Sequence, residues 1–207
     1  MTKGKFIVIE GLDGSGKGTQ IALLAEYLKA NGIQYALTAE PTEHATGGLV
    51  RDTLCGLTKR TPAELAGLFL SDRIAHCSNP VYGMKNLLEK GINVICDRYY
   101  YSSFAYQGMD TDLEWCMRAN MDCPDVLKPD VCIFLDVPPA VCDERISKGR
   151  AAREIYEDSA DTITRIRNKY MEVFEILKDS HNIKIIDASR TPEEVSKDFI
   201  AAVMDVM

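Results

Sequence analysis

The chain has 207 residues, of which 46% are hydrophobic and 27% are charged, and its formal net charge is −7. This length suits one α/β domain whose core needs neither a disulfide nor a metal for stability. The negative charge argues against a surface for nucleic acid or for an anionic membrane, so we expect neither as a partner.

The cysteines indicate a reducing compartment. There are seven, with no C-x-x-C pair and no metal-type spacing. Cys96 and Cys132 lie inside apolar runs, which predicts buried thiols in a cytoplasmic protein. The sequence shows no hydrophobic signal region, no apolar segment long enough to cross a bilayer, and no repeat or linker. We therefore expect one domain over residues 1–207.

The first functional signal is the glycine-rich segment 11–19, GLDGSGKGT. A β-branched run at 6–9 precedes it, and apolar residues with helical spacing follow, which predicts a buried strand, a turn and a helix. In that context glycines let backbone N–H groups converge on a phosphate at the helix N-terminus. Gly11, Gly16 and Lys17 fit the spacing G-x-x-x-x-G-K, whose lysine places a charge between β- and γ-phosphates. The candidate ATP-binding residues are Gly11, Asp13, Gly14, Ser15, Gly16, Lys17, Gly18 and Thr19.

Residue 18 departs from this motif. It is glycine where a Ser or Thr hydroxyl usually ligates Mg²⁺. Either Thr19 supplies the hydroxyl, or carboxylates elsewhere hold the metal through waters. The alternative of an ordinary glycine-rich turn is disfavoured by the flanking strand and helix.

A second strand is predicted over 35–38, after a helix that ends near Asn31 and Gly32. Two strands separated by a helix form a right-handed parallel unit. The segment 40–48 follows the second strand, and ligands bind beyond the carboxyl ends of parallel strands. We expect this segment to be a loop that faces the site, with an ordinary surface connection as the alternative.

A further helix is predicted to begin after Thr61, because 61–64, TPAE, is a capping box with proline at the first helical position. Phe69 and Arg73 are four residues apart in this helix and share one face. Together they offer an aromatic surface beside a guanidinium group. Separately, a core ring and a solvated charge are the usual interpretation.

A third buried strand at 92–96 delivers Asp97 and Arg98 to the same edge of the sheet. Asp97 can hold Mg²⁺ or its waters, and Arg98 can bind a phosphate with two N–H groups. An ion pair between Asp97 and a neighbouring arginine is the structural alternative. The next segment, 102–108, is a predicted helix start rich in donors and acceptors suited to a base or sugar.

The last third of the chain continues the alternation of strands and helices. Strands are predicted at 129–136 and 183–187, a long core helix over 163–177, and a terminal helix after the capping box at 191–194. A helix after the fourth strand leads into a basic segment, which in isolation is as consistent with a solvated face as with a site. Its cations are Arg145, Lys148, Arg150 and Arg153.

In combination these motifs resemble the thymidylate kinases over most of the chain. The segments that carry the resemblance are 11–20, 68–73, 97–99, 105–108 and 128–130. The resemblance implies a three-layer P-loop NTPase fold, with a five-stranded parallel sheet flanked by helices and a short lid at about 147–157. It also implies Mg²⁺-assisted, in-line transfer of phosphate from ATP to dTMP, giving dTDP for dTTP biosynthesis, and a homodimer.

The resemblance assigns roles to individual residues. The dTMP-binding residues that it implies are Asp13, Phe69, Arg73, Arg98, Ser103, Tyr106 and Gln107. Phe69 would stack on thymine and Arg73 would reach its carbonyl edge. Tyr106 would crowd the 2′ position, and Gln107 would read the pyrimidine. Ser103 is the least defined of the set.

Some members of the family carry an extra basic residue in the P-loop and others carry it in the lid. Residue 14 is glycine here, so Arg150 and Arg153 in the lid are the implied transition-state cations. The implied catalytic set is Lys17, Asp97, Arg98, Arg150 and Arg153, with Asp97 and Thr19 as metal ligands. The loop after the fifth strand would border adenine, and Arg51 would be a second ligand for the acceptor phosphate.

Three other functions remain possible at this point. The segment 16–20, GKGTQ, resembles the loop of adenylate kinases, so another nucleoside monophosphate kinase, adenylate- or UMP/CMP-kinase-like, is the main alternative. A non-catalytic nucleotide-binding regulator has only Gly18 in its favour. A GTPase is disfavoured, because the sequence lacks N-K-x-D and has no D-x-x-G outside the P-loop.

Overall fold

The structure is a computed structural model, and it describes residues 2–149, 156 and 160–207. Five parallel strands form one sheet in the order β2-β3-β1-β4-β5. The strands are β1 (Phe6–Gly11), β2 (Tyr35–Ala39), β3 (Asn93–Asp97), β4 (Val131–Asp136) and β5 (Ile183–Asp187). The predicted five-stranded parallel sheet and α/β fold are therefore confirmed.

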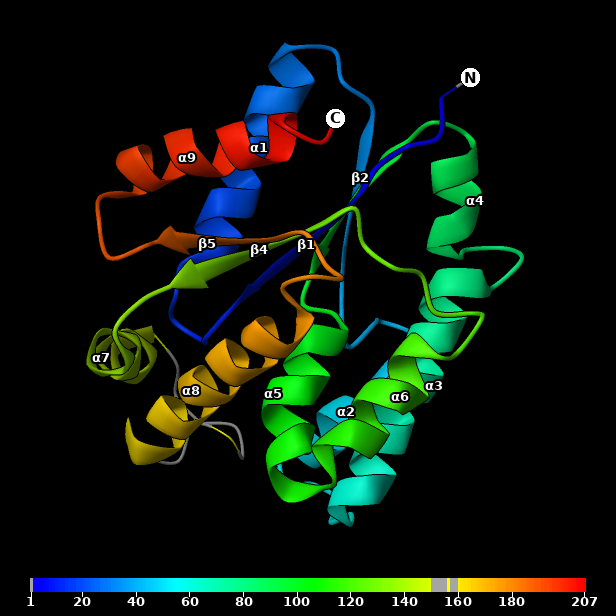
Figure 1. The fold of residues 1–207 in the computed structure, drawn as a ribbon, viewed down its shortest axis with the longest axis vertical. Helices are drawn as coiled ribbons and strands as arrows, with labels where there is room; N and C mark the ends of the chain where they lie inside the picture. The colour runs from blue at the N-terminus through cyan, green and yellow to red at the C-terminus, as the bar shows by residue number, and fades with distance from the viewer. Residues whose placement is uncertain (1, 150–155, 157–159) are drawn as a thin grey trace.

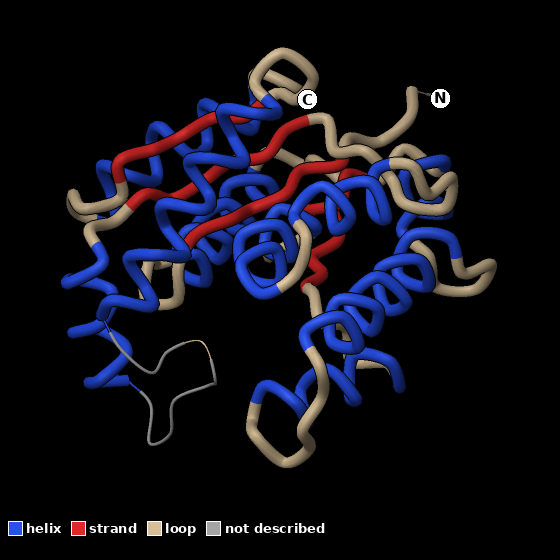
Figure 2. Tube along the Cα trace, turned by 60° about the horizontal axis from the view of Figure 1, so that its bottom comes forward, coloured by secondary structure: helices blue, strands red, loops and turns tan. Residues whose placement is uncertain are grey.

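Helices cover both faces of the sheet (Figure 1). Helices α1 (Lys17–Ala30) and α9 (Pro192–Met204) pack together on one face, and α5 (Tyr100–Asp110) and α8 (Ala160–Leu177) pack together on the other. The remaining helices are α2 (Ala45–Leu54), α3 (Pro62–Ser78), α4 (Met84–Glu89), α6 (Leu113–Met121) and α7 (Pro139–Gly149). In the turned view of Figure 2 the strands lie side by side between these helices, which gives the three layers expected from the sequence.

The central strands read as continuous apolar runs because both of their faces are covered. Every residue of β1 is buried, and β3 and β4 are buried except at their ends. Ile9 in β1 pairs with Asp97, the last residue of β3, so β1 extends two residues beyond β3 at this edge of the sheet. The connections from β1 and β3 run to opposite sides of the sheet, and a crevice forms at such a switch point.

Both predicted capping boxes are present. In each, the threonine hydroxyl accepts the backbone N–H of a glutamate three residues later, and that glutamate's carboxylate accepts the threonine N–H. The pairs are Thr61 with Glu64 at the start of α3, and Thr191 with Glu194 at the start of α9. These local signals predicted both helix starts correctly.

One prediction is wrong in part. The segment 40–48 is not a loop throughout, because α2 begins at Ala45. The glycines at 47 and 48 have low helix propensity, so this helix was not predicted. Its Val50 and Leu54 pack against Leu65 of α3. Tertiary packing thus stabilises a helix that its own composition disfavours.

The cysteines behave as buried thiols for the most part. Cys96 and Cys132 are fully buried, as predicted, and all seven cysteines are free. Burial raises the pKa of both thiols, so neither is a thiolate at neutral pH. Within the described residues, no helix is both long and apolar enough to span a bilayer.

Candidate active site

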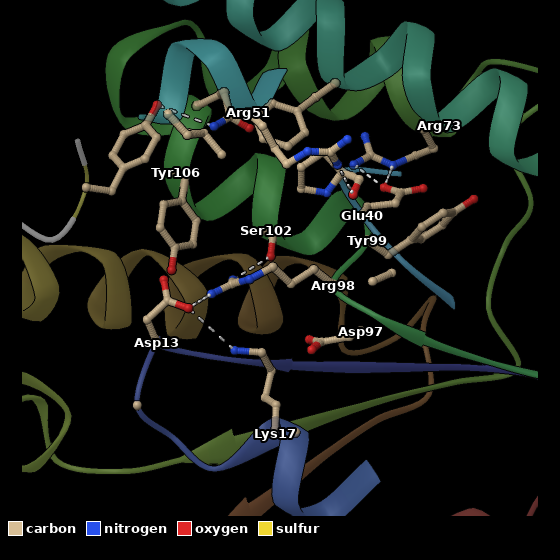
Figure 3. Close-up of a pocket in the computed structure, with 18 of the residues that line it drawn as sticks. Asp13, Lys17, Glu40, Arg51, Arg73, Asp97, Arg98, Tyr99, Ser102 and Tyr106 are labelled. Carbon is tan, nitrogen blue, oxygen red and sulfur yellow. Dashed lines mark hydrogen bonds and ion pairs between the residues drawn. The ribbon is translucent and has the colours of Figure 1, made fainter. Parts of the chain in front are cut away.

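A cavity of about 510 Å³ lies beyond the carboxyl ends of β1, β2 and β3 (Figure 3). Its size lies in the range of small-molecule sites. Predicted site residues on its lining are Asp13, Gly14, Gly16, Lys17, Gly18, Thr19, Phe69, Arg73, Asp97, Arg98, Tyr106 and Gln107. The structure thus gathers residues from segments that are more than ninety positions apart into one space.

The glycine-rich segment is shaped by backbone conformations that favour glycine. Gly14 and Gly16 have φ of 78° and 94°, in the left-handed region. A Cβ on Gly14 would also lie 2.8 Å from the carbonyl oxygen of Cys142 in α7. Residue 14 therefore has no room for the extra basic side chain that some thymidylate kinases carry in the P-loop. Gly16 is the N-cap of α1, so the turn leads directly into a helix N-terminus, a phosphate-binding arrangement.

Lys17, at the start of α1, is buried below this loop. Its ammonium group donates to the carbonyl oxygens of Gly11 (3.0 Å) and Leu12 (3.2 Å) and lies 4.0 Å from an Asp13 carboxylate oxygen. Burial lowers the pKa of Lys17, and Arg98 lowers it further. Asp13 and Asp97 oppose this shift. Lys17 is thus held by the backbone of the glycine-rich loop.

Arg98 faces Lys17 across the Asp13 carboxylate (Figure 3). Its Nη2 donates to Asp13 Oδ1 at 2.8 Å, and its guanidinium group lies 5.3 Å from the ring centroid of Tyr106. Burial opposes its charge, but the negative groups around it, Asp13 first and Glu10 among them, raise the pKa of Arg98 well above its ordinary value. Arg98 therefore remains a full positive charge beside the phosphate loop.

Asp97 lines the cavity at the end of β3, next to the loop. Its Oδ1 is buried and has no hydrogen-bond partner among the described residues. The alternative of an ion pair with a neighbouring arginine finds no support in the described part of the chain. An orphaned carboxylate oxygen in a polar cavity suits a hydrated Mg²⁺, which proteins hold with one or two carboxylates plus substrate phosphates. Thr19, an exposed residue with a hydroxyl group, is on the same lining.

The opposite end of the cavity is built around Arg73, whose side chain is only 1% exposed. Its Nε and Nη2 bind Glu40 Oε2 at 2.8 and 2.7 Å, Nη1 donates to Asn120 Oδ1 at 2.5 Å, and Nη2 donates to Ser103 Oγ at 3.1 Å. Glu40 also contacts His76 Nδ1 at 3.0 Å. A guanidinium group has five N–H donors, so one Nη1 hydrogen has no partner among the described residues.

Aromatic residues complete this end. Phe69 lies on the lining and packs against Val50, Leu54 and Leu65. Tyr156, the one described residue between 149 and 160, accepts a hydrogen bond from Gln107 Nε2 at 3.3 Å. Its ring meets that of Tyr106 edge-on, with centroids 5.1 Å apart. Arg73, Phe69, Gln107 and the two tyrosines line the same cavity and combine aromatic rings with a few polar groups, a combination that suits a nucleobase.

Some predicted site residues are not on the lining. Gly11 and Ser15 shape the loop from behind, and Ser103 lies behind Arg73 and holds it. Arg150 and Arg153, with most of the predicted lid, lie outside the described residues. Arg145 of α7 donates from Nη1 to the carbonyl oxygen of Gly14 at 3.0 Å, which brings one cation of the basic segment to the loop.

Sequence reasoning missed several residues of the site. Glu40 was only a loosely matched loop residue, yet it is the buried partner of Arg73. Asn120 was not considered, because its helix α6 was not predicted. A signal for that helix was present, since the Asp112 side chain accepts the backbone N–H of Trp115 as an N-cap. Tyr156 carried no signal beyond its place in a basic segment.

Comparisons with known proteins identify the family of the chain. A family model described as "Thymidylate kinase" matches residues 9–199. A "Probable thymidylate kinase" of Pyrococcus abyssi is 37% identical over 97% of this chain and 96% of its own length. One of Methanococcus aeolicus is 40% identical with the same coverage, and the "Thymidylate kinase" of Plasmodium falciparum is 34% identical over 99% of this chain and 91% of its own.

Proposed function

The chain belongs to the thymidylate kinase family, and from this premise we infer that it transfers the γ-phosphoryl group of ATP to dTMP. The observation that carries the inference is one cavity whose two ends differ in chemistry. One end has the P-loop with Lys17 and Arg98, and the other has Arg73 and aromatic rings. A nucleoside monophosphate has a phosphate at one end and a base at the other, so this cavity is complementary to it.

Phosphoryl transfer needs charge stabilisation more than covalent chemistry, because negative charge spreads over the equatorial oxygens. The acceptor oxygen of dTMP is already anionic, so no strong general base is required. Lys17 and the amides of the loop would hold the ATP phosphates, and Arg98 would hold the acceptor phosphate. Asp13, 2.8 Å from Arg98 and 4.0 Å from Lys17, would offset the repulsion between the two cations and orient them.

The residues around Asp97 fit a magnesium ion. Asp97 would hold it or its waters, and Thr19 would offer the hydroxyl that Gly18 lacks. When bound, Mg²⁺ neutralises charge on the β- and γ-phosphates. Arg150 and Arg153 are proposed to add positive charge when the segment 147–157 closes, as predicted from the family resemblance.

At the other end, Phe69 would stack on thymine, and the remaining N–H of Arg73 Nη1 would donate to a base carbonyl. Gln107 would address the pyrimidine edge, and Tyr106 would exclude a 2′ hydroxyl. Ser103 contributes through Arg73, to which it is hydrogen bonded. Arg51 lines the cavity and donates to the carbonyl oxygens of Pro41 (3.2 Å) and Thr42 (2.5 Å), so its role as a second phosphate ligand remains a prediction.

A homodimer and a cytoplasmic location belong to the same proposal. The homodimer rests on the family resemblance alone, and the location rests on the buried free thiols. Sedimentation equilibrium tests the dimer. A particle of twice the chain mass of 23.0 kDa is expected, and a single-chain mass at micromolar concentration would contradict it.

The experiment for the function is an ADP-release assay with ATP and Mg²⁺ across dTMP, dUMP, dCMP, UMP, CMP, AMP, dGMP and GMP. We expect dTMP to lead. Arg98→Ala, checked for folding by circular dichroism, should lower kcat/KM for dTMP by roughly 10² to 10³. If AMP is the best acceptor, the resemblance of segment 16–20 to adenylate kinases predicted the substrate better than the other motifs did. If ATP binds without turnover, the regulator hypothesis replaces this one.

A further inference from the structure

A buried carboxylate that the proposed mechanism does not use lies directly behind Arg98. Glu10 is in the interior of β1 and is fully buried. Burial raises the pKa of Glu10, while Arg98 and several hydrogen-bond donors oppose that shift. Burying an ionisable group is costly unless it is well satisfied. The contacts of Glu10 show where it is satisfied.

Four donors converge on this one carboxyl group. Glu10 Oε1 accepts the backbone N–H groups of Tyr99 (2.9 Å) and Ser102 (3.1 Å). Glu10 Oε2 accepts the hydroxyl groups of Ser102 (2.7 Å) and Tyr170 (2.8 Å). Tyr99 and Ser102 belong to the start of α5, and Tyr170 belongs to α8. Glu10 therefore ties β1 to the turn that carries Arg98 and to the helix packed behind that turn.

The backbone of Arg98 requires such support. Its φ is 67°, and it is the only non-glycine residue with positive φ in the described part of the chain. Left-handed backbone costs about 1 kcal/mol or more for a residue with a side chain. The Arg98 N–H donates to the carbonyl oxygen of Ile9 at 2.9 Å, and the next N–H, that of Tyr99, goes to Glu10. Ile9 and Glu10 of β1 thus accept the backbone N–H groups of Arg98 and Tyr99, on the two sides of the left-handed residue.

A second route runs through side chains. Arg98 Nη1 donates to Ser102 Oγ at 3.0 Å, and the Ser102 hydroxyl donates to Glu10 Oε2. A hydroxyl has one proton and two lone pairs. Because Glu10 takes the proton, the lone pairs of Ser102 are directed to Arg98. Figure 3 shows Ser102 above the Arg98 guanidinium group, on the side opposite Lys17.

We propose that Glu10 is a positioning residue for the acceptor phosphate, holding Arg98 in its left-handed conformation and orienting its guanidinium group through Ser102. The proposal rests on the proposed function in one respect, namely that Arg98 binds the acceptor phosphate. It adds that this arginine depends on a carboxyl group that never contacts substrate.

The test is a double-mutant cycle between Glu10→Gln and Arg98→Ala. Gln keeps an oxygen for the two backbone N–H groups but places an NH₂ group against the hydroxyls of Ser102 and Tyr170. We expect Glu10→Gln to lower kcat/KM for dTMP about tenfold while KM for ATP changes less than twofold. In the Arg98→Ala background the same substitution should cause no further loss, because the residue that it positions is gone.

A purely structural role predicts a different pattern, in which Glu10→Gln lowers activity equally in both backgrounds and affects both substrates. That pattern, or an unchanged kcat/KM for dTMP in Glu10→Gln, overturns the proposal. Val203→Ala, in α9 and buried far from the site, is the control for lost packing and should leave KM for dTMP unchanged.

If Glu10→Gln does not fold, Tyr170→Phe replaces it in the cycle. This variant removes one donor to Oε2, together with the contacts of the Tyr170 hydroxyl to Ser102 Oγ (2.9 Å) and Arg98 Nη1 (3.5 Å), and leaves Ser102 in place. A smaller loss of about threefold is expected, again only when Arg98 is present. Equal losses in both backgrounds overturn the proposal here too. Wild-type activity in the monophosphate panel tests the function separately, and the cycle can be run with whichever acceptor leads.

Discussion

The two ends of the cavity are built in opposite ways. The phosphate end comes largely from one continuous segment, whose Gly18 and Thr19 are exposed and whose Lys17 bonds to carbonyl oxygens five and six residues away. The base end comes from residues 30 to 47 positions apart, joined by a buried ion pair between Arg73 and Glu40. The phosphate end is thus a local motif, whereas the base end depends on the assembled fold.

This difference has an energetic consequence. Removing one partner of a buried ion pair leaves an uncompensated charge, whereas changes at an exposed loop residue cost little stability. Substitutions at the base end should therefore affect folding as well as specificity. Substitutions at the phosphate end should affect turnover with little effect on folding.

The largest expected effect is on stability, for Glu40→Ala. The side chains of Glu40 and Arg73 are 2% and 1% exposed, so the variant should lose about 3 to 5 kcal/mol in the free energy of unfolding, measured by urea denaturation. Glu175→Ala breaks the exposed pair with Lys178 and should cost about 0.5 kcal/mol or less. Equal losses of unfolding free energy in the two variants would show that the ion pair between Glu40 and Arg73 does not stabilise the base end.

Lys17→Ala should lower kcat/KM by roughly 10² to 10³, the cost of losing one preorganised charge at a transition state. Calorimetry should find dTMP affinity within a few-fold of wild type, since Lys17 is assigned to the ATP phosphates and Arg98 to the phosphate of dTMP. A large loss of dTMP affinity would break the division between the two ends.

His181 lies outside both ends of the cavity. Its protonation should therefore change the stability of the fold without changing activity. It is half-buried between Ser180 and Tyr100, and burial, with Lys128, lowers its pKa to about 4. Between pH 6.5 and 4 the unfolded chain binds the proton and the folded chain does not, so stability falls as pH falls through this window. After allowance for solvent exposure the loss is about 1 kcal/mol.

His181→Gln should remove this contribution. The test compares urea denaturation of wild type and variant at pH 4, 5 and 7, with activity at pH 7 as the control. Parallel pH curves for the two proteins would contradict the assignment, as would a changed KM for dTMP.

The smallest expected effect is at the residue that departs from the P-loop motif. A Cβ on Gly18 meets no atom within 4 Å, so a serine fits. Thr19→Ala should raise the Mg²⁺ concentration for half-maximal nucleotide binding about threefold, and Gly18→Ser in that background should restore it by supplying the hydroxyl. Binding measured with Mn²⁺ by electron paramagnetic resonance gives a readout independent of turnover. If neither variant changes this Mg²⁺ concentration, Asp97 and water molecules are sufficient to hold the metal without a hydroxyl group.

The sequence predicted what local patterns encode. All five strands, the strand, turn and helix around the glycine-rich segment, and both capping boxes depend on neighbouring residues, and each was confirmed. The resemblance also named most of the residues that line the cavity.

What it could not predict depends on contacts between distant segments. Helix α2 forms because Val50 and Leu54 find Leu65 on α3, and Arg73 is fixed by Glu40, 33 residues away. The left-handed backbone of Arg98 likewise has no signal in its own residue type. These features depend on contacts between segments that are far apart in the sequence, so no short stretch of sequence predicts them.

The most direct measurement is the ratio of kcat/KM for dTMP to that for dCMP, in wild type, Lys17→Ala and Arg73→Lys. Cytosine places an amino group where thymine has a carbonyl, so a donor from Arg73 should favour dTMP. Arg73→Lys keeps the charge for Glu40 but cannot reach Asn120, Ser103 and the base together. We predict that Lys17→Ala lowers both rates and keeps the ratio, and that Arg73→Lys lowers the ratio about tenfold. A ratio that changes with Lys17 and not with Arg73 would contradict the division of the site into a phosphate end and a base end.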